Sequence, residues 1–477
     1  MAYLYGERIQ TDLLPQSIED YVLPDDPVRV YDFFVEQLDF EDLGVHEDRH
    51  QVGPPEYDPK AMLKLLVYGY SYGVRSSRKL ERAVYHNLSF IWLMGGLKPD
   101  HKTIARFRRD NLAALRRVLK QCVRLCLKLD LIDGNILFVD GTKVSANASF
   151  DRSFTKVRCE RLLEKADRRI EEILAECEVV DQAEKDQASL VQMKDELKAA
   201  RSLRDKVQDV LKELERSGRK TINTTDPDCR HVKSRQQVIP GYNLQSVVDD
   251  KNGLIVQADV VNDSNDVRQL GNQIEQANKT LDRKCKIACA DSGYANTQQL
   301  KAVEEQGIKV IVPSQAQARK KPLGPFGKDK FVYDLDRDCY ICPEGQLLRY
   351  RKTDFKTRQK TYQVSRPAIC HRCRNFGVCT KAKQGRSIVV LLDKELKERL
   401  EAQYASPESQ VIYQRRKQLV EHPFGHLKHN LGVRTFRLRG LQGVRAEANL
   451  LATCFNLTRL ITLMGVSRLV YEWSSTR

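Results

Sequence analysis

The stretch Ile136-Leu137-Phe138-Val139-Asp140 predicts a short strand that ends in a carboxylate. The stretch Ile287-Ala288-Cys289-Ala290-Asp291 repeats this arrangement later in the chain. Continuous apolar runs of this length are typical of strands buried on both faces of a sheet, as in α/β proteins. If the two strands are neighbours, about 4.8 Å apart, their terminal carboxylates converge. A turn or cap function is the alternative for each aspartate.

Two converging carboxylates repel one another unless a divalent cation lies between them. Mg²⁺ and Mn²⁺ prefer oxygen ligands and keep open positions for water and substrate phosphates. Two such ions about 3.5–4 Å apart suit phosphate-ester chemistry. A third carboxylate is then expected. Glu421 is the best candidate, because residues 411–445 contain eight Lys or Arg and no other acid. A salt bridge or a helix-terminal charge is the alternative, since Pro423 is expected to disrupt the helix just beyond Glu421.

Composition points to a large protein with a polyanionic partner. The 477 residues suffice for about three domains. An excess of 80 Lys and Arg over 64 Asp and Glu leaves a net charge of +16, which attracts nucleic acid. Residues 1–8 lack the apolar core of an export signal. Asn449, Asn456, Arg459 and Arg468 interrupt the apolar stretch 448–471, so we expect a packed helix, no membrane span and a cytoplasmic location.

Four regions follow one another along the chain. Residues 1–130 read as helical, and Asp58-Pro59 predicts a helix start with a cap followed by proline at the first helical position. The basic segment 101–130, with Arg106, Arg108 and Arg109, suggests a DNA-binding unit, with a solvated basic face as the alternative. Residues 131–313 read as an α/β core, in which Asn252-Gly253 predicts a hairpin. The charged segment 155–217 predicts an inserted helical hairpin or coiled coil. Residues 314–405 are cysteine-rich, and residues 406–477 close the chain with helices.

Five of the 13 cysteines lie between Cys339 and Cys379. In a reducing compartment such a cluster indicates a metal site before disulfides. Two CxxC pairs, each able to place two thiolates on one tetrahedral Zn²⁺, predict a structural zinc site. The pairs are Cys339 with Cys342 and Cys370 with Cys373, and Cys379 is an alternative fourth ligand, a spare or a buried small residue.

Several blocks, in this order, resemble the DDE transposases of bacterial insertion sequences, in the branch with an InsH-type N-terminal domain. Singly these blocks are weak signals, but together and in order they are a strong one. They are Pro99-Asp100 with Thr103 and Arg106-Phe107-Arg108; Asp140-Gly141-Thr142-Lys143; Thr225-Asp226-Pro227-Asp228 with Gly241-Tyr242-Asn243; Ala290-Asp291-Ser292-Gly293-Tyr294; and Glu421-His422-Pro423-Phe424-Gly425 with Lys428.

The resemblance implies a ribonuclease H-like mixed sheet. It also implies that Asp140, Asp291 and Glu421 bind two Mg²⁺ ions. Tyr413, Arg416, Lys417 and Lys428 surround the third acid, and the basic ones are expected to contact DNA phosphates. The related motif separates Tyr from Arg by two residues and that Arg from Glu by three. Arg416 has the motif's distance from Tyr413, and Lys417 has the motif's distance from Glu421, so both stay candidates for the phosphate contact. Tyr413 either stacks on a base or packs in the core.

The expected function is that of an insertion-sequence transposase. Such an enzyme hydrolyses phosphodiester bonds at the element ends, and the freed 3′-hydroxyl then attacks target DNA. Terminal inverted repeats and target DNA are the expected partners, and pairing of two ends requires at least a dimer. The alternatives are an inactive or repurposed DNA-binding protein and a metal-dependent nuclease without strand transfer.

Overall fold

The computed structural model describes residues 17–45, 56–182, 187–234, 237–319, 324–355 and 358–475. Residues 1–8, in which we expect no export signal, lie outside the described residues. The chain forms a mixed α/β structure with a helical N-terminal region. It divides into two compact units. Unit 1 comprises Met1–Asp266, Asn272–Cys285 and Gln418–Arg477, and unit 2 comprises Val267–Gly271 and Lys286–Lys417.

Unit 1 begins with short helices, whose starts the sequence marks clearly. The carboxylate of Asp58 accepts hydrogen bonds from the backbone N–H groups of Lys60 and Ala61, and Pro59 occupies the first helical position, as predicted. Asp100 caps α6 through the N–H of Thr103. These elements are η1 (Ile18–Tyr21), α1 (Val28–Glu36), α2 (Phe40–Leu43), α3 (Pro59–Ser71), α4 (Ser77–His86), α5 (Leu88–Leu93), α6 (His101–Asp110) and α7 (Leu112–Lys128).

An antiparallel sheet forms the centre of unit 1. Its long middle strand β5 (Gln237–Asp249) pairs with β1 (Ile136–Ser145) along one edge. Along its other edge β5 pairs first with β4 (Arg230–Ser234) and then with β6 (Ile255–Val261). The predicted β5–β6 hairpin is confirmed, and Gly253 takes a positive φ of 68° in its turn.

One strand end differs from the prediction. We expected the first apolar strand to end at Asp140, but β1 continues for five more residues, so Asp140 lies in mid-strand. The polar residues after Asp140 stay extended because β5 offers a partner for each of them, as far as Ser145 opposite Gly241. A Cβ added to Gly241 would lie 2.6 Å from the carbonyl oxygen of Val144, so only glycine allows this close approach of the two strands.

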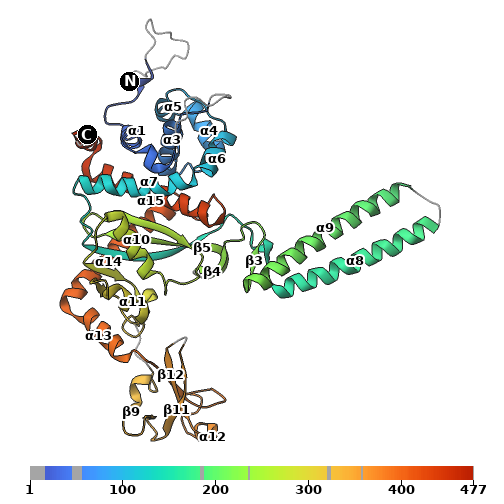
Figure 1. Cartoon of the computed structure of the whole chain (residues 1–477), viewed down its shortest axis with the longest axis vertical. Coiled ribbons are helices and arrows are strands. Elements are labelled where there is room, and N and C mark those ends of the chain that lie inside the picture. Colours follow the sequence, from blue (N-terminus) through green and yellow to red (C-terminus); the bar gives the residue numbers. More distant parts are fainter. Residues whose placement is uncertain are drawn as a thin grey trace, which may run out of the picture. The chain divides into compact units, whose positions relative to one another are not determined.

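The charged segment folds as the predicted helical hairpin, made of α8 (Lys156–Gln182) and α9 (Gln187–Ser217), which pack side by side. It extends away from the rest of unit 1 (Figure 1). At its base a small apolar cluster of Cys159, Val207, Leu214 and Ile222 is buried. There η2 (Phe150–Arg152) and the short strand β2 (Ser153–Phe154) lead into α8, and β3 (Ile222–Asn223) pairs with β2.

Helix α15 (Gly440–Met464) has 15 buried residues and packs against α3, α7 and β6. The two asparagines that interrupt its apolar sequence face the backbone of β6. The side chain of Asn456 accepts from the N–H of Ile255 and donates to its carbonyl, both at 2.8 Å. Asn449 donates to the carbonyl of Ala258 at 3.1 Å. Unit 1 also contains α16 (Val466–Ser475) and most of α10 (Leu270–Leu281).

In the described residues, no single helix is long and apolar enough to cross a membrane. Only α15 and α16 together meet the length and composition criteria, and they are bent by 104° at the break between them. Most of α15 is buried within unit 1, as a packed helix requires.

Unit 2 contains a parallel pair of strands and an antiparallel sheet. The parallel pair β7 (Ile287–Ala290) and β8 (Lys309–Ile311) is connected through η3 (Ser292–Tyr294) and α11 (Thr297–Glu304). The antiparallel sheet is a meander in which each strand pairs with the next along the chain. It consists of β9 (Val332–Asp334), β10 (Cys339–Ile341), β11 (Leu347–Asp354), β12 (Gln359–Val364) and β13 (Ser387–Leu391), with η4 (Lys328–Lys330) before it and α12 (Pro367–His371) between its last two strands.

Two helices follow the cysteine-rich sheet of unit 2. They are α13 (Lys394–Ala405) and α14 (Pro407–Gly425). Unit 2 ends at Lys417, so the first part of α14 belongs to unit 2 and its last part to unit 1. The five-residue π-helical turn η5 (His426–Asn430) follows in unit 1.

A buried ion pair ties the N-terminal helices to α15. The Arg75 guanidinium lies 3.0 Å from a carboxylate oxygen of Glu447, and their side chains are 5% and 0% exposed. Glu447 also accepts the N–H groups of Arg437 and Leu438, and Arg75 also donates to the carbonyls of Gly432 and Thr435. Burial raises the pKa of Glu447, and these donors partly oppose the rise.

We expect Glu447→Ala to lower the free energy of unfolding by about 3–5 kcal/mol, because Arg75 would keep a buried and unpaired charge. Urea denaturation followed by circular dichroism measures the change. The control is Glu275→Ala, which breaks an exposed pair with Lys279 and should leave the midpoint nearly unchanged. Equal midpoint shifts for the two variants would contradict the importance of the buried pair.

Candidate functional site

Asp140 lies on β1 in unit 1, opposite Ser246 of β5. Its side chain is partly exposed, and one of its carboxylate oxygens accepts the N–H of Gly141 at 2.8 Å. Because side chains alternate along a strand, Asp140 and Thr142 point to the same face of the sheet. The hydroxyl of Ser246 is buried and has no hydrogen-bond partner among the described residues. The surroundings of Asp140 on this sheet are therefore polar.

Lys428 joins the third sequence block to the first. Its ammonium group donates to the hydroxyl of Thr142, two residues after Asp140 on β1. Lys428 lies in η5, directly after α14, and Glu421 lies on the exposed surface of α14. Within unit 1, the turn after the helix of Glu421 thus contacts the strand that carries Asp140.

The helix around Glu421 differs from the prediction. We expected Pro423 to disrupt it just beyond Glu421, but α14 includes Pro423 and ends at Gly425. Proline removes only one backbone donor, and its neighbours Val420 and Leu427 are 1% and 4% exposed, so apolar packing holds the segment. The wider π-helical turn that follows places Lys428, and turns of this kind are frequent at functional sites.

A polar network on the other face of β1 and β5 was missed in the sequence. Asp266 pairs with Lys143 at 3.3 Å and accepts hydrogen bonds from the side-chain amides of Asn243 at 2.6 Å and Gln245 at 2.8 Å. Asn243 and Gln245 are fully buried on β5. Alternating amides in a strand, one of them within the block Gly241-Tyr242-Asn243, were the available signal, because a buried amide needs a polar partner.

Asp291 lies in unit 2, directly after β7, as predicted. It caps η3, and its carboxylate accepts the N–H of Gly293 at 2.7 Å. The side chain is partly exposed. Asp140 and Glu421 belong to unit 1 and Asp291 to unit 2, so the meeting of the three carboxylates stays a prediction.

The residues before Glu421 lie on the part of α14 that belongs to unit 2. The Arg416 guanidinium lies over the Tyr413 ring, 5.6 Å from its centre, and Tyr404 meets the same ring edge-on at 5.0 Å. Burial raises the pKa of Tyr413. Lys417 is exposed, whereas Arg416 is half-buried. Their phosphate contacts and the base stacking of Tyr413 stay predictions.

The block Thr225-Asp226-Pro227-Asp228 has a structural function. Asp226 is fully buried and accepts the Tyr242 hydroxyl at 2.7 Å and the N–H of Gly440 at 3.2 Å. Asp228 accepts the N–H of Leu441 at 2.9 Å. The two carboxylates therefore cap the N-terminus of α15 and attach it to the sheet.

The basic helix α6 presents one charged face. Lys102, Arg106 and Arg109 are exposed, and their spacing of four and three residues places them on the same side of the helix. Arg108 points inward, is 6% exposed, and donates to the Tyr70 hydroxyl and to the carbonyl of Arg75. This geometry gives Arg108 a structural function, whereas DNA contacts by Arg106 and Arg109 stay a prediction.

The five clustered cysteines do not share one environment. Cys339 is 1% exposed on β10, whereas the other four line a pocket of unit 2. Cys122, Cys126 and Cys454 are buried in unit 1. As the structure stands, no group of three or more His, Cys, Asp or Glu side chains in its described part could hold a metal ion. The predicted magnesium and zinc ligands therefore stay predictions.

The two kinds of aspartate in unit 1 should respond differently to substitution. We expect Asp226→Ala to lower the free energy of unfolding by about 2–4 kcal/mol, because a buried hydroxyl and a helix N-terminus lose their acceptor. Asp140→Asn keeps an oxygen for the N–H of Gly141 and should change stability by less than about 1 kcal/mol. Urea denaturation of the two variants measures both values, and a severe loss for Asp140→Asn would mean that Asp140 serves the fold.

Two family models match separate parts of the chain, and neither match includes Asp140 or Asp291. Residues 341–461, which include Glu421, match the family model of a transposase DDE domain, and residues 16–110 match that of a transposase domain (DUF772). The search of curated proteins gives no match. Among solved structures, a chain of the piggyBac transposase synaptic complex with hairpin DNA is similar over 95% of this chain and 80% of that chain, with 8% identity and a TM-score of 0.35, a level that supports no conclusion. The two family models confirm the resemblance to DDE transposases that the sequence motifs carry.

Proposed function

We propose that this protein is the transposase of an insertion sequence. In this proposal it cuts DNA at the element ends and joins the freed 3′-hydroxyl to target DNA. Asp140, Asp291 and Glu421 form its active site on a ribonuclease H-like core. The protein acts as a dimer or larger assembly on two element ends, and it is a cytoplasmic, nucleoid-associated protein.

One contact supports this proposal most strongly. Lys428, seven residues after Glu421, donates a hydrogen bond to Thr142, two residues after Asp140 on β1. The blocks on either side of this contact are far apart in sequence, and each resembles a catalytic block of the transposase family. An unrelated fold has no reason to bring these two blocks together on one sheet face.

The acidic residues suit Mg²⁺ or Mn²⁺. Carboxylate oxygens are the ligands that these ions prefer, and the orphaned hydroxyl of Ser246 adds a polar group opposite Asp140. Asp140, Asp291 and Glu421 would hold the ions. Bound metal would lower the pKa of water and stabilise charge on the phosphate oxygens. The chain itself contributes Lys428, Arg416 and Lys417, whose charges would bind and orient the strand to be cut.

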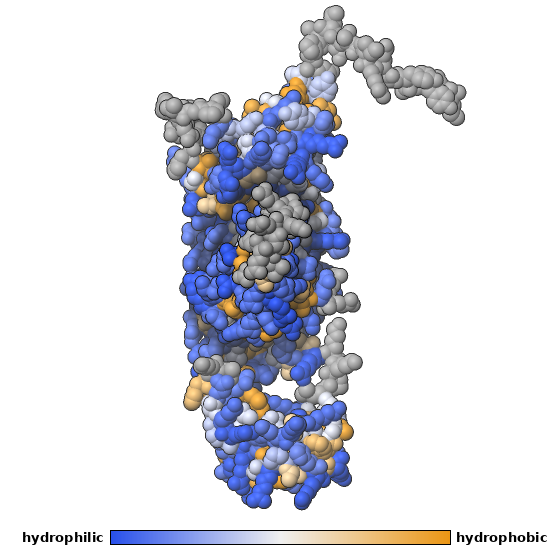
Figure 2. All heavy atoms as spheres, turned by 90° about the vertical axis from the view of Figure 1, so that its right-hand side faces the viewer, coloured by the Kyte–Doolittle hydropathy of each residue, from blue (hydrophilic) through white to orange (hydrophobic). Residues whose placement is uncertain are grey.

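The surface suits a polyanionic partner. Figure 2 shows a face on which hydrophilic residues predominate and hydrophobic ones form small, separate groups. The net charge of the chain is +16. The exposed side of α6 concentrates three of the positive charges, so we propose that this helix contacts the terminal repeats.

The catalytic assignment is tested by cutting of DNA. With Mg²⁺ and a supercoiled plasmid that carries the element ends, the wild type should produce cut and joined products, seen on gels. Asp140→Asn, Asp291→Asn and Glu421→Gln should each lower cutting at least about 100-fold, because even outer partners of metal ligands cost about 10–100-fold. Their binding to the ends should persist.

The matched control is Glu408→Gln on the same helix as Glu421, whose side chain is 87% exposed and which should cut normally. Wild-type binding without cutting would favour the inactive or repurposed DNA-binding protein. Cutting without joined product would favour the nuclease. Full cutting by Asp140→Asn would refute the assigned active site.

The DNA contact of α6 is tested by the dependence of binding on salt. Each phosphate contact adds about 0.9 to the slope of log affinity against log salt concentration. The triple variant Lys102→Ala, Arg106→Ala, Arg109→Ala should therefore lower the slope by about 2.7, measured by fluorescence anisotropy. Lys279→Ala on α10, whose charge is already paired with Glu275, is the control. An unchanged slope in the triple variant would leave this face of α6 as a solvated surface.

A further inference from the structure

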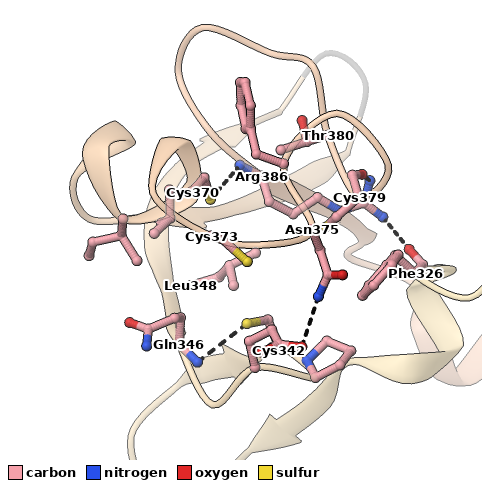
Figure 3. Close-up of a pocket in the computed structure, with 15 residues that line it drawn as sticks. Phe326, Cys342, Gln346, Leu348, Cys370, Cys373, Asn375, Cys379, Thr380 and Arg386 are labelled. Carbon is pink, nitrogen blue, oxygen red and sulfur yellow. Dashed lines mark hydrogen bonds between the residues drawn. The ribbon is translucent and has the colours of Figure 1, made fainter.

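Four cysteines of unit 2 surround one small pocket. Cys342, Cys370, Cys373 and Cys379 contribute to its wall, together with apolar residues such as Leu348 (Figure 3). The cavity has a volume of about 40 Å³, whereas a single water needs about 10–15 Å³. A space of this size holds one metal ion between the four sulfur atoms of its wall.

Three turns supply these four side chains. Cys342 follows β10 in a turn closed by the hydrogen bond from the N–H of Gly345 to the Cys342 carbonyl. Cys370 lies near the end of α12, and the N–H of Cys373 donates to its carbonyl at 3.1 Å. The N–H of Cys379 donates to the carbonyl of Asn375 at 2.8 Å. Tight turns allow cysteines from separate segments to face one point, as in zinc-binding modules.

Cys339, by contrast, is separated from this pocket by the geometry of its strand. Cys339 and Tyr340 are neighbours on β10, so their side chains point to opposite faces of the sheet. Tyr340 belongs to the aromatic core cluster of this sheet, and Cys342 and Cys379 pack against the same cluster. Cys339 therefore lies on the other face. The first CxxC sequence, although its spacing is typical of zinc ligands, cannot act as a two-thiolate pair here.

Backbone amides already donate to two of the four sulfurs. The N–H of Gln346 lies 3.3 Å from the sulfur of Cys342, and the N–H of Arg386 lies 3.3 Å from that of Cys370. A neutral thiol is a weak acceptor, whereas a metal-bound thiolate is a strong one, so donors of this kind support metal ligands. Gly385 has a positive φ of 76°, and a Cβ there would meet Val364 at 2.5 Å, so this glycine is needed for the close approach to Cys370.

A cation also faces the pocket. Arg386 lines it and donates to the carbonyl of Cys379 at 3.0 Å, while its Nε atom is buried and has no hydrogen-bond partner among the described residues. Four thiolates around one Zn²⁺ carry a net charge of −2, and the positive charge of the partly buried Arg386 would offset part of it.

We propose that Cys342, Cys370, Cys373 and Cys379 bind one structural Zn²⁺ tetrahedrally, and that Cys339 is a core residue. Each thiol loses its proton to solvent as its sulfur binds the metal. The sulfurs are not yet gathered into a group that could hold an ion in the described structure, so their side chains rotate inward to reach about 2.3 Å from the metal. The closed shell of four ligands leaves no position for substrate. The site therefore stabilises the small sheet, whose apolar core cluster contains five buried residues in the described part of the chain.

The zinc content of the full-length protein tests this ligand set. Protein purified under reducing conditions should contain about one zinc per chain by elemental analysis. Cys342→Ser, Cys370→Ser, Cys373→Ser and Cys379→Ser should each lose most of it, and Cys339→Ser should keep it. Replacement by Co²⁺ should give the intense visible bands of a tetrahedral tetrathiolate site in the wild type and in Cys339→Ser.

A second variant covers the case in which serine prevents folding. Cys379→His keeps a ligand, so it should retain the metal and shift the Co²⁺ spectrum, whereas Cys339→His should leave the spectrum unchanged or fail to fold. Reduced wild-type protein without zinc would overturn the proposal. So would zinc loss in Cys339→Ser together with retention in Cys379→Ser, or disulfides that join the four cysteines in pairs. Asp140→Asn should contain normal zinc, so the outcome is independent of the proposed catalytic function.

Discussion

The edge of β6 depends on a row of polar side chains from α15. Arg445, Asn449, Asn456 and Arg459 follow one side of this helix, and each bonds to the backbone between Asn252 and Val260. A buried strand edge whose backbone groups lack partners would cost free energy at every orphaned group. Because α15 also packs against α3 and α7, it holds the sheet and the N-terminal helices in one unit. The caps from Asp226 and Asp228 and the pair with Arg75 fix the start of the same helix.

The sequence alone predicted those structural elements that a few adjacent residues determine. The apolar run before Asp140, the Asn252-Gly253 hairpin and the Asp58-Pro59 helix start were all confirmed, because a few adjacent residues determine each of them. The predicted end of β1 was wrong, because β5 continues to pair with β1 beyond Asp140. The asparagines of α15 read as interruptions of an apolar helix. Their purpose became clear only with the neighbouring strand, since hydrogen-bonding partners distant in sequence leave no periodic signal.

In the candidate site, too, features that depend on adjacent residues were predictable, whereas contacts between residues distant in the sequence were not. The sequence blocks around them identified the three acids. The contact of Lys428 with Thr142, by contrast, joins residues that are far apart in the sequence, so no spacing pattern predicts it. The cysteines are a different case, because the decisive signal was present in the sequence. Cys339-Tyr340-Ile341 is a strand-like run that ends just before Cys342, and residues three apart in a strand point to opposite faces. Spacing typical of a zinc knuckle requires a turn between the two cysteines, and here the turn comes after the second one.

The acids that maintain the fold are buried, whereas the acids proposed to bind metal ions are exposed to solvent. Asp226, Asp249 and Glu447 have 0–1% exposure, and each accepts two or more hydrogen bonds that tie distant segments together. Burial also raises the pKa of Asp249 and Glu447, so these carboxylates depend on their donors to stay charged. Asp140, Asp291 and Glu421 are partly or fully exposed, where ions and substrate phosphates can reach them. A carboxylate enclosed by backbone donors is a poor ligand for an exchangeable ion, whereas one at the surface of a rigid strand or helix combines access with a fixed position.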